Sequence, residues 1–178
     1  MNKISNIYLV GFMGSGKTTV GRLLSKKIGF LYIDLDKKIE KNEGLSISQI
    51  IQRFGEERFR ELESELLSTI SIDDCNVIAT GGGIVIKDIN WDYLNKSGVV
   101  IYLKADIDQL WNRVKKSNTR PLLRVENPYL KFKELFNSRE TLYLKADLTI
   151  DTSKKSVNTV VDELACIIKT LKKIINSD

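Results

Sequence analysis

The chain has 178 residues, of which 42% are hydrophobic and 29% are charged, as is ordinary for a soluble globular protein. This length predicts one domain, spanning residues 1–178, that buries its own core. It contains no run of about 18 or more apolar residues and no secretory signal, so we expect no membrane association and a cytoplasmic location. The absence of histidine excludes His-based acid–base catalysis and His-ligated metals.

The formal charge of +5 is compatible with nucleic acid, with anionic ligands or with a lysine-rich surface. Lysines far outnumber arginines, so each arginine is a candidate for a position that needs a rigid guanidinium to bind carboxylate or phosphate. The two cysteines, Cys75 and Cys166, are far apart and lack metal-ligand spacing. We therefore expect free, partly buried thiols, as is usual in the cytoplasm.

The most informative segment is residues 11–18, which read G-F-M-G-S-G-K-T, a complete G-x-x-x-x-G-K-[ST] phosphate-binding loop. Its glycines let the backbone approach phosphates, and its N–H groups form an anion-binding nest. Lys17 can reach the β- and γ-phosphates, and the Thr18 hydroxyl can ligate Mg²⁺. A strand-like run precedes the loop and a helical pattern follows it, which argues against a chance match. The chain is therefore predicted to bind ATP or GTP.

Five apolar, strand-like runs alternate with helical patterns along the chain, at residues 4–10, 30–33, 77–79, 99–103 and 148–150. This alternation predicts an α/β fold with a mainly parallel sheet that is covered on both sides. A capping box at residues 46–49 predicts a short helix over residues 47–54, followed by a longer helix over residues 56–70. A long amphipathic helix is predicted from Val157 to Ile175.

Ligands of such a sheet bind beyond the carboxyl ends of its strands, so the polar residues there are candidates for a site. Asp34 and Asp36 follow the second strand, and an extended backbone would point both carboxylates to one face. One could support Mg²⁺ through water, and the other could act as a base toward an acceptor hydroxyl. Alternatively, they are an N-cap and a first-turn acid of a helix beginning near Lys37.

The third strand ends in T-G-G-G, at residues 80–83. Three consecutive glycines suit a turn with positive φ, a backbone on which a ligand lies, or an ordinary tight turn. On the longer predicted helix, Arg60 and Glu63 are i, i+3 neighbours. One interpretation is a surface ion pair, which contributes little to stability. The other is that the glutamate orients the arginine to bind an anion.

Residues 114–127 are polar and cationic and have no clear period, which indicates a mobile loop. Arg120 lies within this segment, and Arg139 follows it. In an enzyme that binds phosphates, a cationic mobile loop is readily interpreted as a lid.

Taken together, these segments resemble the shikimate kinases, small enzymes of the P-loop kinase superfamily. The resemblance covers nearly the whole chain. It rests on an ordered set of motifs: G-F-M-G-S-G-K-T-T-V-G, D-L-D, G-E-E-R-F-R-E-L-E, T-G-G-G, R-P-L-L, R-x-x-L-Y and I-D-T. It implies a three-layer α/β sandwich with a five-stranded parallel sheet, the nucleoside monophosphate kinase-like P-loop NTPase fold. It also implies ATP-dependent phosphorylation of the 3-hydroxyl of shikimate, in the route to chorismate and the aromatic amino acids.

The resemblance also implies roles for individual residues. Asp36, Lys17 and Arg120 would be catalytic, and Thr18 and Asp34 would hold Mg²⁺. ATP would be bound by Gly14, Ser15, Gly16, Lys17, Thr18, Thr19, Arg113, Arg120 and Lys155. Shikimate would be bound by Asp36, Arg60, Gly81, Gly82, Gly83 and Arg139. Lys155 and Val157 stand where the family commonly has arginine and proline, so the adenine contacts are left open.

Several competing functions also have a phosphate-binding loop. A gluconate or nucleoside monophosphate kinase shares it, but the pairing of R-F-R-E-L-E with T-G-G-G favours shikimate. A GTP-dependent switch would need N-K-x-D, and residues 95–98 read N-K-S-G. A nucleic-acid partner is not expected, because the basic residues form no stripe interleaved with aromatics. Nothing in the sequence demands more than a monomer.

Overall fold

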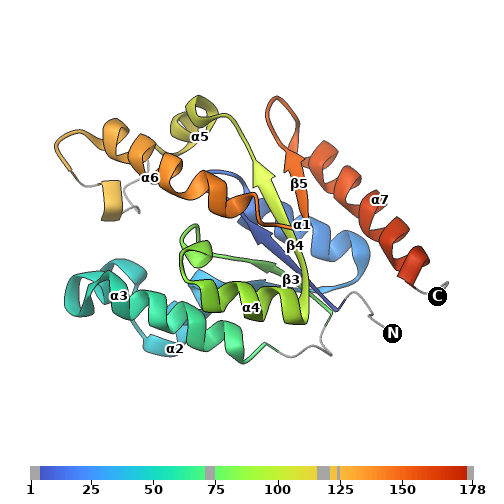
Figure 1. Ribbon diagram of the computed structural model, residues 1–178, viewed down its shortest axis with the longest axis horizontal. Helices are drawn as coiled ribbons and strands as arrows, with labels where there is room; N and C mark the ends of the chain where they lie inside the picture. Colours follow the sequence, from blue (N-terminus) through green and yellow to red (C-terminus); the bar gives the residue numbers. More distant parts are fainter. Residues whose placement is uncertain (1–4, 71–74, 116–120, 124, 176–178) are drawn as a thin grey trace.

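The computed structural model describes residues 5–70, 75–115, 121–123 and 125–175. These residues form a five-stranded sheet with helices packed around it (Figure 1). Its strands are β1 Asn6–Val10, β2 Leu31–Asp34, β3 Asn76–Ala79, β4 Gly98–Lys104 and β5 Leu148–Asp151. Their order in space is β2-β3-β1-β4-β5, and every neighbouring pair is parallel. The predicted parallel α/β sheet is therefore confirmed, with β1 at its centre.

Helices connect the successive strands, as parallel pairing requires, and a further helix follows β5. Those of the described residues are α1 Lys17–Ile28, α2 Leu35–Glu43, α3 Ile47–Ser68, α4 Asp88–Ser97, α5 Ile107–Val114, α6 Pro128–Tyr143 and α7 Val157–Ile175. Two 3₁₀ turns, η1 Ile84–Ile86 and η2 Pro121–Leu123, lie between them. The predicted C-terminal helix is confirmed as α7.

Both faces of the sheet are buried, each under its own helices. Along β1, Ile7 and Leu9 pack with α1 and α7, whereas Tyr8 and Val10 pack with the core formed by α2 to α6. This alternation follows from the strand's two-residue side-chain period. Because both faces are covered, β1 is apolar on both sides, and the molecule has three layers.

Helix α3 consists of two segments that meet at Gly55, whose φ of 85° and ψ of 165° are not helical. The predicted capping box opens the first segment, because Ser46 and Gln49 exchange side-chain to backbone hydrogen bonds. The prediction of two successive helices is confirmed by this break. Glu56 begins the second segment, which carries Arg60 toward the interior.

The local geometry of Asp34 and Asp36 differs from the extended segment that we expected. Strand β2 ends at Asp34, whose carboxylate accepts a hydrogen bond from the Lys37 backbone at 3.2 Å and caps α2. Asp36 lies in the first turn of that helix. The alternative, an N-cap followed by a first-turn acid, is therefore the correct local description. The two carboxylates still line the same cavities described below.

Both cysteines are free, as expected, but Cys166 is exposed and only Cys75 is half-buried. The expectation of partial burial is therefore wrong for Cys166, because it lies on the outer side of α7. Within the described ranges, no helix combines the length and the apolarity needed to cross a bilayer.

Candidate active site

Two cavities adjoin at the carboxyl edge of the sheet. The first, of about 420 Å³, contains the phosphate-binding loop, and the second, of about 570 Å³, contains two arginines. Both are lined by Met13, Thr18, Asp34, Asp36 and Gly82. A molecule in one cavity can therefore meet a molecule in the other across these five residues.

The phosphate-binding loop joins β1 to α1 and ends at Gly16, the N-cap of α1. Gly16 has a φ of 93°, a conformation that favours glycine, and it leaves the first helical N–H groups open to the first cavity. The Lys17 ammonium is largely buried and donates to the carbonyl oxygens of Gly11 at 2.7 Å and Phe12 at 3.1 Å. The loop thus holds its cation beside an anion-binding helix terminus.

The opposite wall of the first cavity comes from the segment after β5 and from α5. Lys155 lines it and forms an ion pair of 2.7 Å with Glu163 of α7. Arg113 donates to the carbonyl oxygen of Gly14 at 3.0 Å. Val157 also lines this wall. The wall is therefore part cationic and part apolar.

Thr18 and Asp34 are in contact where the two cavities join. The Thr18 hydroxyl donates to Asp34 Oδ2 at 3.2 Å, and the Tyr32 hydroxyl donates to the same oxygen at 3.2 Å. Burial and the Asp34 charge raise the pKa of Tyr32, so that phenol remains a donor.

A divalent ion beside Asp34 would have few protein ligands. No three His, Cys, Asp or Glu side chains of the described ranges gather at metal-binding distances. An ion at Thr18 and Asp34 would therefore take its other ligands from phosphate oxygens and water. Mg²⁺ fits such a site, because it commonly keeps several waters and binds through one or two carboxylates and substrate phosphates.

Gly81, Gly82 and Gly83 form the floor of the second cavity, but none of them has a positive φ. The turn with positive φ is therefore the wrong explanation for the three glycines. A Cβ at Gly83 would collide with the Arg60 guanidinium, and one at Gly81 would collide with carboxylate oxygens of Glu63 and Asp36. Glycine is needed at these two positions because the side chains of the site occupy the space of a Cβ.

Arg60 and Glu63 form a buried ion pair, not a surface one. The exposed fraction is 8% for the Arg60 side chain and 0% for that of Glu63, and their closest atoms are 2.5 Å apart. Burial raises the pKa of Glu63 to about 7, against the lowering effect of Arg60. Because α3 packs both residues inward, the glutamate orients the arginine toward the second cavity.

Arg139 reaches the second cavity from α6 and is also buried. Burial lowers its pKa, and the nearby charge of Arg60 acts in the same direction. The Tyr143 hydroxyl donates to the carbonyl oxygen of Gly82 at 2.5 Å, and Tyr143 is also hydrogen-bonded with Arg139. Tyr143 therefore connects the glycine floor with the second arginine.

The structure brings the predicted site residues together at these two cavities, with one exception. Arg120 lies outside the described residues, as do residues 116–119 and 124 of the predicted lid at 114–127. Of that segment, Leu122 in η2 lines the second cavity. Sequence reasoning assigned no role to Met13, Glu56 or Tyr143. All three lie within motifs quoted above, and R-x-x-L-Y also places Tyr143 one helical turn after Arg139.

Known proteins resemble the chain over nearly its full length. The family described as shikimate kinase matches residues 13–169. The shikimate kinase of Thermodesulfovibrio yellowstonii is 45% identical over 173 residues, which cover 97% of this chain and 98% of that protein. A structure of the Acinetobacter baumannii shikimate kinase in complex with shikimate has a TM-score of 0.90 at 36% identity and covers 96% of both chains.

More distant structures share only the fold. A gluconokinase from Sinorhizobium meliloti 1021 has a TM-score of 0.61 at 14% identity, with 99% of this chain and 98% of that chain covered. Such a likeness places the sheet and its helices in the P-loop kinase fold without indicating an acceptor. The fold is shared by several kinase families, whereas the family match and the sequence identity of the closer relatives distinguish one of them. The chain therefore belongs to the shikimate kinase family.

Proposed function

We propose that the chain transfers the γ-phosphoryl group of ATP to the 3-hydroxyl of shikimate and releases shikimate 3-phosphate and ADP. The observation that carries this proposal is the junction of two cavities, one built around a phosphate-binding loop and one around two buried arginines. Membership of the shikimate kinase family supports it, as does the relative from A. baumannii whose structure contains shikimate.

In this proposal the first cavity binds ATP. Its lining residues in this role are Gly14, Ser15, Gly16, Lys17, Thr18, Thr19, Arg113 and Lys155. Arg120, which lies outside the described residues, is the further ATP ligand and catalytic cation of the proposal. The Lys17 ammonium exchanges its carbonyl partners for phosphate oxygens, and α1 presents its N-terminus to them. Thr18 and Asp34 would hold Mg²⁺, which when bound neutralises charge on the phosphates.

The second cavity binds shikimate. Arg60 and Arg139 hold its carboxylate, while the backbone of Gly81, Gly82 and Gly83 supports the ring. This orientation directs the 3-hydroxyl to Asp36, which lies at the junction of the cavities. The hydroxyl oxygen attacks the γ-phosphorus, the bond to the β–γ bridging oxygen breaks, and the hydroxyl proton passes to the Asp36 carboxylate.

The remaining proposals concern the setting of this reaction. Closure of the lid at 114–127 would exclude water, which otherwise competes as the acceptor. We propose that residues 1–178 act as one monomeric, cytoplasmic domain, with neither nucleic acid nor membrane as a partner. The free thiols of the two cysteines support the cytoplasmic location.

One assay separates this function from its rivals. We expect ADP release from ATP and Mg²⁺ to increase strongly with shikimate, and not with gluconate or AMP, because the second cavity holds a buried arginine pair for the carboxylate of a small acid and the chain belongs to the shikimate kinase family. The measurement is coupled detection of ADP. A chain that releases no shikimate-dependent ADP does not have the proposed activity.

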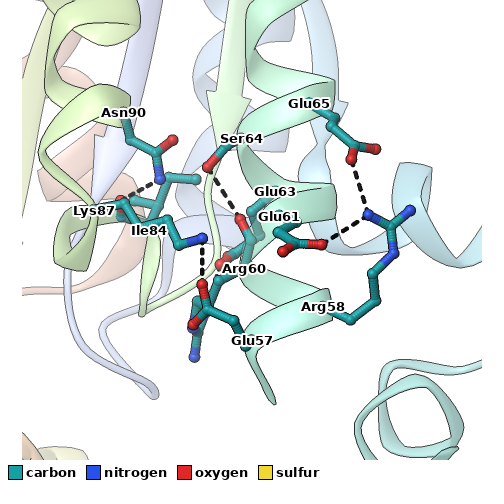
Figure 2. A network of polar contacts seen from close by, with 10 residues as sticks. All are labelled: Glu57, Arg58, Arg60, Glu61, Glu63, Ser64, Glu65, Ile84, Lys87 and Asn90. Atoms are coloured by element: carbon teal, nitrogen blue, oxygen red, sulfur yellow. Dashed lines mark hydrogen bonds and ion pairs between the residues drawn. The ribbon is translucent and has the colours of Figure 1, made fainter. Parts of the chain in front are cut away.

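Replacement of Arg139 tests the carboxylate clamp. We expect Arg139→Ala to raise the KM for shikimate at least about tenfold, because a charge-assisted pair at a buried position is removed. ATP binding, measured by fluorescence titration, should persist. Arg58→Ala is the matched control, since Arg58 bonds to Glu61 and Glu65 on the outer side of α3 (Figure 2). Unchanged shikimate kinetics in Arg139→Ala would remove Arg139 from the clamp.

Replacement of Asp36 tests the base. Asp36→Asn keeps the size of the side chain but removes its proton affinity, so we expect kcat to fall by at least about 10². Pre-steady-state measurement of ADP formation reports the chemical step directly. If the variant reacts at close to the wild-type rate, Asp36 only positions the hydroxyl.

The buried Glu63 should make folding depend on pH. Its pKa is raised from 4.5 to about 7 in the folded chain, so the folded state binds the proton more tightly. The resulting stability is complete below the unfolded pKa and is lost as pH rises through about 7. We expect the free energy of unfolding, relative to Glu63→Gln, to fall by about 2 kcal/mol between about pH 5 and pH 8.

Urea denaturation at several pH values measures this difference. The interpretation is simplified because the chain contains no histidine, the side chain that ordinarily titrates in this range. A difference between wild type and Glu63→Gln that stays constant over the range contradicts a raised pKa at Glu63.

A further inference from the structure

Two acids of different exposure hold the Arg60 guanidinium. Nη1 donates to Glu63 at 2.5 Å, and Nη2 donates to Glu56 at 2.6 Å. The Glu63 side chain is fully buried, whereas 39% of the Glu56 side chain is exposed. The buried Nε of Arg60 has no partner among the described residues, so the guanidinium retains donors for a further anion.

Glu56 also acts on the second arginine. Its charge favours the protonated forms of both Arg60 and Arg139, whereas the two arginines disfavour each other. Arg60 and Arg139 carry two positive charges, and Glu56 and Glu63 carry two negative charges when ionised. The charge of the arginine pair is thus compensated before any ligand arrives.

The carboxylate of a substrate would be a third anion at this pair. Glu63 cannot make way for it, since it has no exposed surface and its departure would leave Arg60 with an uncompensated buried charge. Glu56 can leave at little cost, because a partly exposed ion pair contributes little and its carboxylate can return to water. Glu56 also begins the helical segment after the break at Gly55, where neighbouring turns constrain it least.

We propose that Glu56 is a displaceable internal anion, which occupies the arginine pair until the carboxylate of the substrate replaces it. This inference rests on the proposed function, in which Arg60 and Arg139 bind that carboxylate. Glu56 then weakens the binding of every anion that must displace it. Simple anions must displace it with the arginine contacts alone, whereas the substrate gains further contacts at Gly82 and Asp36.

The test compares Glu56→Gln with Glu57→Gln. Both remove one negative charge from the same turn of α3, but Glu57 is 75% exposed and pairs with Lys87 at 2.6 Å, as Figure 2 shows. We expect Glu56→Gln to lower the KM for shikimate about threefold, the scale of one partly exposed charge pair. Inhibition by sulfate, competitive with shikimate, should strengthen by a similar factor. Glu57→Gln should change neither quantity.

Two outcomes overturn the proposal. A higher KM for shikimate in Glu56→Gln would mean that Glu56 still holds Arg60 in the complex, and an unchanged KM would mean that no displacement occurs. Glu56→Ala serves as a second variant, with the same expected direction, if Glu56→Gln does not fold as judged by circular dichroism.

The proposed function is tested separately in the same experiment. If the wild type shows no shikimate-dependent ADP release, that function fails, and the anion exchange is then tested with sulfate alone. Sulfate should raise the melting temperature of Glu56→Gln more than that of Glu57→Gln. Any binding of sulfate at the phosphate-binding loop is common to both variants, so the difference between the two shifts reports binding at the arginine pair. Equal shifts would refute the exchange.

Discussion

The site depends on the burial of one ion pair, between Arg60 and Glu63. Moving two charges out of water costs several kcal/mol for each ion, so the pair persists only where geometry and further partners compensate. The surroundings meet that demand in several places. Gly81 and Gly83 leave room for the two side chains, and Glu56 binds the second guanidinium nitrogen. A side chain added to the floor would disturb the pair before it touched a ligand.

The strand order explains why this pair lies beside a phosphate-binding loop. Because β3 is the direct neighbour of β1, the glycine floor after β3 meets the loop after β1. Thr80 fixes this approach, since its hydroxyl donates to the carbonyl oxygen of Leu9 at 2.9 Å. A Cβ at Gly82 would lie 3.5 Å from the Met13 nitrogen, so the two segments are in contact. The junction of the cavities is therefore a consequence of the parallel topology.

The strands, the capping box and the break at Gly55 could be predicted because each depends on neighbours in sequence. The burial of Arg60 and Glu63 could not be predicted, because their i, i+3 spacing is equally typical of an exposed helix face. Their burial depends on how α3 packs against the rest of the chain. The need for glycine at positions 81 and 83 could not be predicted for the same reason, because side chains from α2 and α3 occupy the space of a Cβ there. Shikimate was predicted as the acceptor from the ordered motifs that the chain shares with the family, not from the periodicity of its apolar residues.

The two cavities hold their cations in a related way, but the partners of the two cations differ in charge. Lys17 rests on the carbonyl oxygens of Gly11 and Phe12, and Arg60 rests on carboxylates. A ligand that bound either cation would replace an existing partner and would not have to order a free side chain, which reduces the entropic cost of binding. An anion that replaces a neutral carbonyl gives up less electrostatic attraction than one that replaces a carboxylate. If Glu56 is displaced as proposed, an anion with no contacts beyond the arginines would therefore bind the second cavity more weakly than it would without Glu56.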